Sequence, residues 1–501
     1  MAHRPERQFA TALADLPGLS LSESDPAGAT VVTGISFDSR DVRSGDLYAA
    51  LPGASAHGAD FVTAAIQSGA AAILTDAAGQ EKAGEVPIPV VMVSNPREIL
   101  GELSAKIYGD PGESMTLIGV TGTNGKTTMT YLIAAALAES GELVGIIGTT
   151  GVRIGEEALA IARTTPESPD LHALLALMKE RGVTAVALEV SSHALVLGRV
   201  NGLRFDIATF MNLTQDHLDF HGTMTEYFRA KAALFGSDRA RRAVIAIDDS
   251  WGRQLLVETS IPAQSFAISQ EADWTLTDRE HSDSGAWRGR AHGPDGVVVD
   301  LTSRLPGQFN QSNALGALAT LVGLGYSPDT VAAGISACRG VPGRMEPVGT
   351  APFAAFVDYA HTPEAVERAI KAVREFCSGK ILVAVGCGGD RDATKRPQMG
   401  RAAAVNADFV VVTDDNPRSE DPASIRSAVL SGIAKPVSTE VLEIGDRAQA
   451  IHELVNRARS GDAILVLGKG HETGQEIAGE TIPFDDREVL DREISAAEAV
   501  G

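Results

Sequence analysis

The chain has 501 residues, of which 44% are hydrophobic and 22% charged, and its formal net charge at pH 7 is −22. This length exceeds what one hydrophobic core supports, so we expect several globular domains. The negative charge argues against nucleic acid or an anionic membrane as a partner, and three cysteines without metal-site spacing suit a cytoplasmic protein with no membrane insertion.

Three blocks of alternating strands and helices follow one another along the sequence. We predict an N-terminal domain over residues 1–108, a central domain over 109–340 and a C-terminal domain over 341–501. Glycine- and proline-containing segments separate them, near Tyr108 and near Arg339. In the first block the predicted strands are 31–37, 71–74 and 90–93, and the predicted helix is 61–69.

The second block opens with a buried strand at residues 117–120, a glycine turn at 122–125 and a helix containing residues 131–137. A strand, a glycine turn with Gly-Lys-Thr and a helix together form a phosphate cradle. Lys126 would reach the terminal phosphates of a nucleoside triphosphate, and Thr127 would ligate Mg²⁺. The glycine spacing departs from the usual pattern, and the alternative is a tight turn with a surface lysine. The predicted ATP-binding residues are Gly122, Thr123, Asn124, Gly125, Lys126, Thr127 and Thr128.

Further apolar runs at 185–190, 207–211 and 243–247, with a helix at 170–179, predict a parallel sheet. The shorter polar and apolar strands over 263–305 suggest an antiparallel extension. In the third block, strands at 356–357, 381–385, 409–412 and 463–467 predict a second, doubly wound domain. The expected fold class is therefore α/β, with a small N-terminal domain, a central phosphate-loop domain and a Rossmann-like C-terminal domain.

Polar motifs follow the predicted strands of the second block: Glu189 ends one strand, the segment 212–219 containing His217 follows the next, and Lys231 lies on a helix. With the phosphate loop, this ordered set resembles the Mur ligases, ATP-dependent enzymes that add amino acids during peptidoglycan precursor synthesis. In the third block, Asp-Asn-Pro-Arg at 415–418 resembles the diaminopimelate signature of this family. The resemblance extends from about Ser36 to Asp485.

A metal site is expected where these motifs meet. Glu189 is a hard oxygen ligand for Mg²⁺ beside Thr127. His217 is a less usual ligand and could instead be a strand-end hydrogen bonder, but the resemblance implies that it holds a second magnesium. Lys231 alone would be read as a lysine that snorkels to water. The resemblance implies that CO₂ carboxylates it to an anionic metal ligand, and an amine of depressed pKa could react in this way.

The resemblance also implies a site for UDP-N-acetylmuramoyl-L-Ala-D-Glu. Ser39 would contact the uridine side, and the guanidinium of Arg199 suits a carboxylate or pyrophosphate. Taken singly, Ser39 and Thr164 are ordinary turn or cap residues. Leu197 stands where some members have a substrate-contacting glutamine and is left out. The residues expected at this substrate are Ser39, Thr164, Thr165, Ser191 and Arg199.

Two further groups complete the expected site. Asn310 and Asn313 precede an alanine-rich helix, where capping is the alternative role, and the resemblance implies that they, Arg344 and Asp358 approach ATP. For meso-2,6-diaminopimelate, Arg418 would pair with the distal carboxylate and Glu472 with its amine, although Asp-Asn-Pro-Arg is also a common turn sequence. The residues expected at diaminopimelate are Arg391, Asp415, Asn416, Pro417, Arg418, Gly468 and Glu472.

The expected reaction is ATP-dependent amide ligation through an acyl phosphate, in which Lys126, Lys231, His217 and Arg344 serve catalysis and the enzyme is a monomer. Three alternatives remain. A folylpolyglutamate synthetase would lack the uridine site, and a lysine-adding ligase would leave Arg418 without a carboxylate to pair with. A nucleotide-binding regulatory protein would not need the intact set of Lys126, Glu189, His217 and Lys231.

Overall fold

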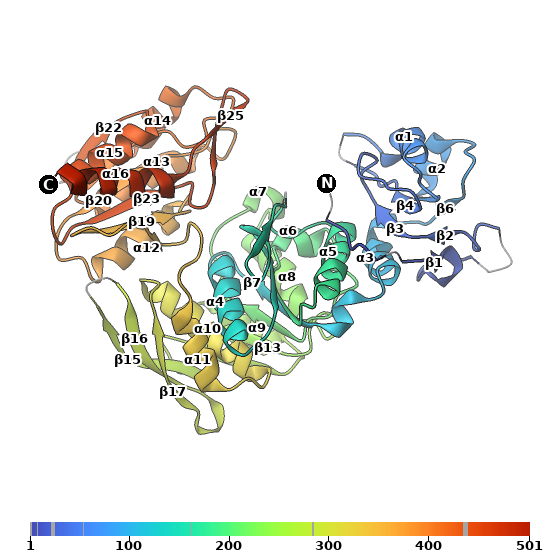
Figure 1. Ribbon diagram of the computed structural model, residues 1–501, viewed down its shortest axis with the longest axis horizontal. Helices are drawn as coiled ribbons and strands as arrows, with labels where there is room; N and C mark the ends of the chain where they lie inside the picture. The colour runs from blue at the N-terminus through green and yellow to red at the C-terminus, as the bar shows by residue number, and fades with distance from the viewer. Residues whose placement is uncertain are drawn as a thin grey trace. The chain divides into compact units, whose positions relative to one another are not determined.

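The computed structural model describes residues 3–7, 9–21, 26–53, 55–161, 163–282, 285–433 and 439–500. The chain forms two compact units, the first made of residues 1–275 and 316–334 and the second of residues 276–315 and 335–501. Strand β15 (Trp274–His281) and helix α10 (Gln308–Gly323) each run from one unit into the other (Figure 1).

The first unit begins with a sheet of four parallel strands in the order β3-β4-β5-β6. Successive side chains of a strand face opposite sides of a sheet. Leu47 and Ala49 accordingly pack with Leu100 and Leu103 of α3, whereas Tyr48 packs with α1 on the other face. The elements are β1 (Thr11–Ala12), β2 (Val31–Val32), β3 (Gly34–Ser36), β4 (Asp46–Ala49), α1 (Val62–Gln67), β5 (Ala72–Thr75), α2 (Ala77–Ala83), β6 (Val90–Met92) and α3 (Pro96–Ile107).

A larger sheet of eleven strands begins in the same unit with the order β10-β9-β8-β11-β7-β12-β13-β14-β15, and it continues into β16 (Trp287–His292) and β17 (Val298–Ser303). Strands β8 to β15 of this order run parallel, and β9 and β10 add an antiparallel edge. The strands are β7 (Thr116–Thr121), β8 (Val144–Gly148), β9 (Gly151–Ile154), β10 (Glu157–Leu159), β11 (Ala185–Glu189), β12 (Ile207–Phe210), β13 (Ala243–Ala246) and β14 (Ala263–Ala267).

Helices connect the parallel strands of this sheet, and α4 packs on β8 and β11. Because β7 lies between β11 and β12, the carboxyl ends of these three strands meet at one edge, where α/β sheets bind ligands. The helices are α4 (Lys126–Glu139), α5 (Ser168–Glu180), α6 (Ser192–Val196), α7 (Leu218–His221), α8 (Met224–Ala232), α9 (Ser250–Glu258) and α11 (Pro328–Ala337).

The second unit contains a six-stranded sheet in the order β18-β19-β23-β20-β21-β22, parallel except for β18. Alternate side chains of β20 face two different cores: Val383 packs with α12, α13 and α14, whereas Leu382 packs with α15 and α16. The strands of this sheet are β18 (Glu346–Pro347), β19 (Ala354–Asp358), β20 (Ile381–Val385), β21 (Phe409–Val412), β22 (Glu440–Glu443) and β23 (Ala463–Leu467). The unit also contains β16 (Trp287–His292) and β17 (Val298–Ser303) of the larger sheet and a two-stranded sheet of β24 (Gly474–Ile477) and β25 (Glu480–Pro483). The helices are α12 (Pro363–Arg374), α13 (Lys395–Asn406), α14 (Pro422–Ser431), α15 (Arg447–Arg457) and α16 (Asp486–Val500).

The structure differs from the sequence-based expectation at the extension over 263–305 and at Asn310 and Asn313. Within the extension over 263–305, β14 runs parallel to β13 because the helix α9 carries the chain back, whereas β16 and β17 pair antiparallel as expected. Asn310 and Asn313 do not precede their helix but lie inside its first two turns, since α10 begins at Gln308.

Candidate functional site

The phosphate-type loop, residues 122–125, connects β7 to the first turn of α4. Gly122 has a φ of +151° and Gly125 a φ of +91°, which favour glycine. The Nζ atom of Lys126 donates to the carbonyl oxygens of Gly122 at 2.9 Å and Thr123 at 3.1 Å, so its charge lies over the loop. Thr127 and Thr128 are buried in the first turn of α4. The positive end of a helix and a lysine thus occupy one loop, an arrangement that favours phosphate.

Asn212, which follows β12, fixes this loop from the neighbouring strand. Its backbone oxygen accepts the N–H of Thr123 at 3.0 Å, and its side-chain oxygen accepts the N–H of Asn124 at 2.9 Å. Its amide nitrogen donates to the oxygen of Asn124 at 3.0 Å. The sequence analysis included this asparagine in the segment 212–219 but assigned it no role. Its position just after a predicted parallel strand could have indicated one.

Glu189 ends β11, one strand away from the phosphate-type loop, and its side chain is buried. Its carboxylate accepts the N–H of Thr149 at 2.9 Å and the hydroxyl of Thr149 at 3.0 Å. Among the described residues no lysine, arginine or histidine forms an ion pair with it. A buried carboxylate held only by neutral donors suits a cation as its further partner.

Lys231 is fully buried on α8, where its Nζ atom donates to the oxygen of Gly122 at 2.8 Å. The same atom lies 4.6 Å from the ring centre of Tyr227. Burial, followed by the positive charge of Lys126, lowers the pKa of Lys231 well below its ordinary value. The geometry therefore joins α8 directly to the loop and favours an uncharged amine.

His217 lies next to this group but is half exposed, and its backbone has a φ of +51°. Its ring lies 4.8 Å from the ring of His193, and the Tyr227 ring lies 6.4 Å away. Burial lowers the pKa of His217, the carboxylate of Asp216 opposes this shift, and the charge of Lys126 adds to it. A neutral imidazole at this position is able to bind a metal.

Arg199 belongs to a group of three arginines around one buried carboxylate. Glu167 lies 2.9 Å from the Nε atom of Arg199, 3.2 Å from Arg97 and 3.7 Å from Arg163. Three guanidinium groups against one carboxylate leave two positive charges, which favours an anionic ligand. Arg97 and Arg163 were not among the predicted residues. Because Arg97 is distant from the other two arginines in the sequence, the sequence does not indicate that the three meet at Glu167.

Thr165, another predicted residue of this region, connects Arg199 to Glu189 through hydrogen bonds. The hydroxyl of Thr165 donates to the backbone oxygen of Glu189 at 2.8 Å, and Arg199 donates to the oxygen of Thr165 at 3.3 Å. Ser191 caps α6, and Thr164 lies 3.2 Å from Thr149. Ser39 lies in the loop after β3, away from this hydrogen-bond network.

In the second unit, Asn310 and Asn313 are buried neighbours, with the amide of Asn313 donating to the side-chain oxygen of Asn310 at 3.0 Å. Asp358 ends β19 and accepts the N–H of Met345 at 2.7 Å. Burial raises the pKa of Asp358, while the nearby Arg344 opposes this shift. The guanidinium of Arg344 stacks 4.6 Å above the ring of Tyr359.

The residues predicted for the incoming amino acid follow three adjacent strands of the second sheet. Arg391 follows β20, residues 415–418 follow β21, and Gly468 and Glu472 follow β23. The amide of Asn416 donates to Glu472 at 2.8 Å, and a Cβ atom on Gly468 would lie 2.6 Å from Asp415. Arg418 pairs with Glu476 at 3.2 Å, whereas Arg391 is exposed and its side chain donates to the backbone oxygen of Asp390 at 3.3 Å.

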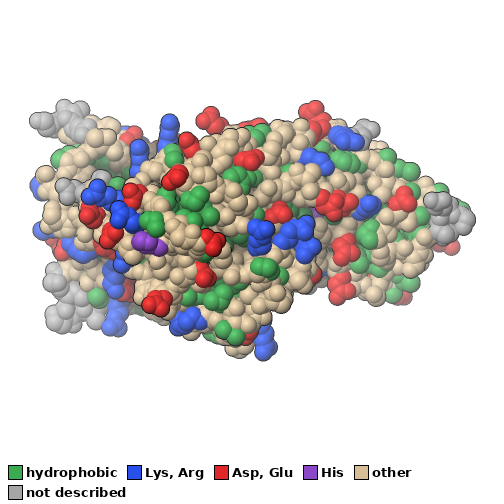
Figure 2. Space-filling view, turned by 90° about the horizontal axis from the view of Figure 1, so that it is seen from below, with side chains coloured by type: hydrophobic (Ala, Val, Ile, Leu, Met, Phe, Trp, Pro, Cys, Tyr) green, Lys and Arg blue, Asp and Glu red, His purple; other side chains and the backbone are tan. Residues whose placement is uncertain are grey.

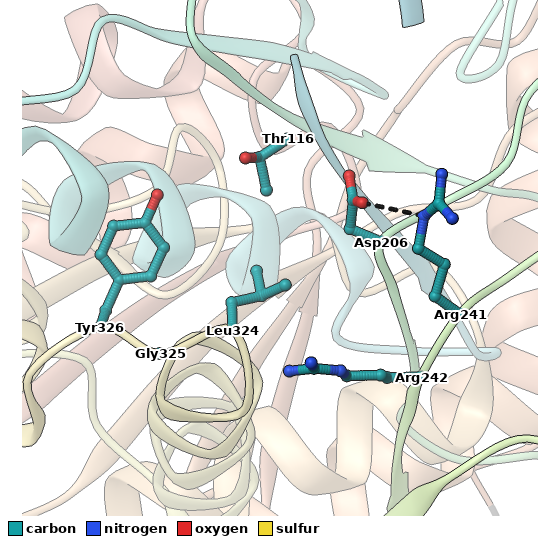
Figure 3. A pocket seen from close by; sticks show the side chains of 7 residues that line it. All are labelled: Thr116, Asp206, Arg241, Arg242, Leu324, Gly325 and Tyr326. Atoms are coloured by element: carbon teal, nitrogen blue, oxygen red, sulfur yellow. Dashed lines mark ion pairs between the residues drawn. The ribbon is translucent and has the colours of Figure 1, made fainter. Parts of the chain in front are cut away.

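A separate pocket of about 370 Å³ lies at the opposite, amino-terminal ends of strands β7, β12 and β13 (Figure 3). Thr116, Arg242 and Tyr326 are among its lining residues, and Asp206 pairs there with Arg241 at 3.2 Å. None of the predicted site residues lines it. Figure 2 shows a face on which acidic, basic and hydrophobic side chains are interspersed without one continuous charged patch. Within the described chain, no helix combines the length and the apolar character of a membrane span.

Comparison with known proteins decides the family. Models of the Mur ligase family match residues 31–108 (Mur ligase family, catalytic domain), 120–321 (Mur ligase middle domain) and 343–470 (Mur ligase, glutamate ligase domain). The UDP-N-acetylmuramoyl-L-alanyl-D-glutamate--2,6-diaminopimelate ligase of Streptomyces avermitilis is 50% identical over 493 residues, or 97% of each protein. The chain belongs to the Mur ligase family.

Solved structures of Mur ligases share its fold. The structure of a UDP-N-acetylmuramoyl-L-alanyl-D-glutamate--2,6-diaminopimelate ligase is 30% identical, with a TM-score of 0.71 over 98% of this chain and 100% of that one. The MurF ligase of Thermotoga maritima, solved with ADP, is 19% identical, with a TM-score of 0.64 over 93% of this chain and 98% of that one. These findings confirm the three-domain α/β architecture of a Mur ligase.

The domain limits at 108 and 340 remain predictions for this Mur ligase, as do the roles of the individual site residues. The structure does bring Gly122, Lys126 and Lys231 into one hydrogen-bonded group. It also brings Asn416 and Glu472 together in the second unit.

Proposed function

We propose that the chain joins meso-2,6-diaminopimelate to the D-glutamyl residue of UDP-N-acetylmuramoyl-L-Ala-D-Glu, using ATP and releasing ADP and phosphate. The observation that carries this proposal is the 50% identity, over 97% of the chain, to a relative named for this substrate pair. We place the reaction in the cytoplasm, as a step of peptidoglycan precursor synthesis, and expect a monomer.

The reaction has two steps. A side-chain carboxylate oxygen of the D-glutamyl residue attacks the γ-phosphorus of ATP, forming an acyl phosphate and ADP. The amine of diaminopimelate then attacks the acyl carbon, loses a proton and displaces phosphate, which leaves an amide. Phosphoryl transfer of this kind depends mainly on positioning and charge neutralisation. Lys126 and the first turn of α4 would supply positive charge at the phosphates, and Arg344 would add to it.

The residues present fit magnesium. Glu189 is a buried carboxylate with neutral donors, and Thr127 offers a hydroxyl in the first turn of α4. Among the described residues, no group of three or more His, Cys, Asp or Glu is arranged to hold a metal ion. Following the family resemblance, the metal set that we propose is Thr127, Glu189, His217 and a carboxylated Lys231. Magnesium bound there would neutralise charge on the β- and γ-phosphates.

The two other substrates have matching charges in the protein. The three arginines around Glu167 suit the anionic muramoyl dipeptide, for which Ser39, Thr164, Thr165 and Ser191 are further proposed contacts. In the second unit, Arg418 would take the distal carboxylate of diaminopimelate and Glu472 its ammonium group. Lysine lacks that carboxylate and would give Arg418 no ligand group to bind beyond its own partner Glu476, so we expect strong discrimination against it.

An ADP-release assay with ATP, the UDP-muramoyl dipeptide and a panel of amines tests this function. We expect release with diaminopimelate and at least about 100-fold lower kcat/KM with lysine. The variant Lys126→Met is the negative control, because it removes the phosphate-binding charge together with the two hydrogen bonds of Lys126 to the loop. Background release with all three substrates would contradict the proposal, and equal use of lysine would favour a lysine-adding ligase.

A further inference from the structure

Lys469 is a fully buried lysine at the carboxyl end of β23, directly after Gly468. An ammonium group taken out of water is costly unless charged or polar partners surround it. It lies outside the phosphate-type loop and was not among the predicted site residues. The role of Lys469 therefore depends on the groups that surround its ammonium group.

The partners of Lys469 are all residues that we place at diaminopimelate. Its Nζ atom donates to the side-chain oxygen of Asn416 at 2.8 Å and to an oxygen of Glu472 at 3.3 Å. A carboxylate oxygen of Asp415 lies 3.8 Å away. One ammonium group thus ties the loop after β21 to the loop after β23.

These contacts fix which way the amide of Asn416 points. Its oxygen accepts from Lys469 and also from the backbone N–H of Glu476 at 3.0 Å, so its nitrogen must face the other way. That nitrogen donates to the Oε2 atom of Glu472 at 2.8 Å. Among the described residues, no hydrogen bond to the Oε1 atom of Glu472 occurs. Glu472 is therefore held by one oxygen while the other can accept an ammonium group.

The charges agree with this arrangement. Asp415 and Glu472 carry two negative charges, and Lys469 balances one of them. One negative charge remains, which matches the single ammonium group at the distal end of the amino acid. Without Lys469, two buried or half-buried carboxylates would face each other and the amide of Asn416 could rotate.

We propose that Lys469 is a positioning residue that sets Asn416 and Glu472 for the distal ammonium group of diaminopimelate. This inference rests on the proposed function, because it assumes that these residues receive that amino acid. Lys469 acts through its neighbours and touches neither ATP nor the reacting carbonyl in this account.

The test compares diaminopimelate with 2-aminopimelate, which keeps both carboxylates but lacks one amino group. In Lys469→Met we expect the KM for diaminopimelate to rise about 10- to 100-fold, the range expected for a lost charged hydrogen bond. The kcat/KM for 2-aminopimelate and the KM values for ATP and the UDP-muramoyl dipeptide should stay within about twofold. The preference for diaminopimelate over its analogue therefore falls at least about tenfold. A general loss of folding would lower activity with both amines and would not change this ratio.

Lys371→Met is the matched control, since the side chain of Lys371 on α12 is exposed and, within the described part of the chain, its ion pair is with Glu367 alone. It removes the same charge from the same unit and should leave the ratio unchanged. If Lys469→Met fails to fold, Lys469→Gln carries the same comparison with a neutral side chain that retains hydrogen bonding. An unchanged ratio in an active, folded Lys469 variant overturns the inference alone. A wild-type protein that releases no ADP with diaminopimelate overturns the proposed function as well.

Discussion

Glu167 shows how one buried carboxylate organises an anion-binding region. The arginines around it come from three places: α3, the segment before α5 and the turn after α6. Burial lowers the pKa of the Arg199 guanidinium, and the charges of Arg163 and Arg97 add to this effect. In a chain with a net charge of −22, such a local excess of positive charge is what allows an anionic substrate to bind.

The variant Glu167→Gln tests this organisation. Arg199 would lose its charged anchor, and the three guanidinium groups would repel one another. We expect the KM for the UDP-muramoyl dipeptide to rise about tenfold, as for a lost charge-assisted hydrogen bond. The KM for diaminopimelate should not change. The control is Glu157→Gln, which breaks only the exposed pair with Arg181. A rise in both KM values would contradict the assignment.

Lys231 carries the second prediction at this scale. Burial lowers the pKa of its amine, which favours the uncharged form, and the uncharged amine is the form that reacts with CO₂. We expect Lys231→Met to reduce kcat at least about 100-fold, within the range for a lost charge-stabilising group. The wild type, incubated with isotope-labelled bicarbonate, should show a carbamate signal by NMR that is absent in Lys231→Met.

Lys106→Met supplies the control, because Lys106 is a half-exposed helical lysine paired with Asp110. It should retain both the activity and the carbamate signal. An unmodified amine in the active wild-type enzyme would refute carboxylation of Lys231 whatever the activity of the variant.

Helix α5 contains a buried histidine that links stability to pH. The Nε2 atom of His172 lies 3.0 Å from the oxygen of Asn201, and the Nδ1 atom has no hydrogen-bond partner among the described residues. Burial lowers the pKa of His172 from 6.5 to about 4. The unfolded chain therefore binds a proton between these pH values that the folded chain does not bind. Stability contributed by the neutral ring is present above pH 6.5 and is lost as the pH falls towards 4.

We expect the titration of this histidine to lower the free energy of unfolding by about 3 kcal/mol as the pH falls from 7 to 4. In His172→Gln the amide can keep the bond to Asn201 but does not titrate. The difference in unfolding temperature between the wild type and the variant should therefore shift in favour of the variant as the pH falls. His452→Gln, at an exposed site on α15, is the control. Parallel pH profiles for the wild type and His172→Gln would contradict the assignment.

The sequence predicted the elements best where apolar runs were unbroken. The strands at 381–385, 409–412 and 463–467 match β20, β21 and β23, because buried parallel strands are apolar on both faces. The half-buried β22 was missed, since it has only two apolar residues, between two glutamates, at a sheet edge. The direction of β14 was wrong because pairing direction depends on the crossover helix and not on the strand residues.

The candidate site was predictable where a local motif carries the chemistry, as in the loop at 122–127. Lys469, Asn212 and Arg97 were missed for a different reason. Each acts through a partner distant in sequence: Asn416 for Lys469, the loop residue Asn124 for Asn212, and Glu167 for Arg97. A single sequence contains no record of such pairs.

At the scale of the whole molecule, the chain is divided into two units with separate cores. One unit holds the phosphate-type loop, Glu189 and the arginine cluster, and the other holds the loops proposed for diaminopimelate. Separate cores allow each unit to respond to its own ligand, because a ligand stabilises the structure that binds it.

Hydrogen exchange measured by mass spectrometry tests this division on the full chain. With the UDP-muramoyl dipeptide and a non-hydrolysable ATP analogue already bound, added diaminopimelate should slow exchange in residues 386–391, 413–418 and 468–472. Protection would follow because backbone N–H groups of these loops open less often once the ammonium and carboxylate groups are paired. The UDP-muramoyl dipeptide alone should instead protect residues 163–167 and 191–199. Lysine at the same concentration is the matched ligand control and should protect the second unit far less. If diaminopimelate protected only residues of the first unit, the assignment of Arg418 and Glu472 to this amino acid would be wrong, because their loops would then open as often as before.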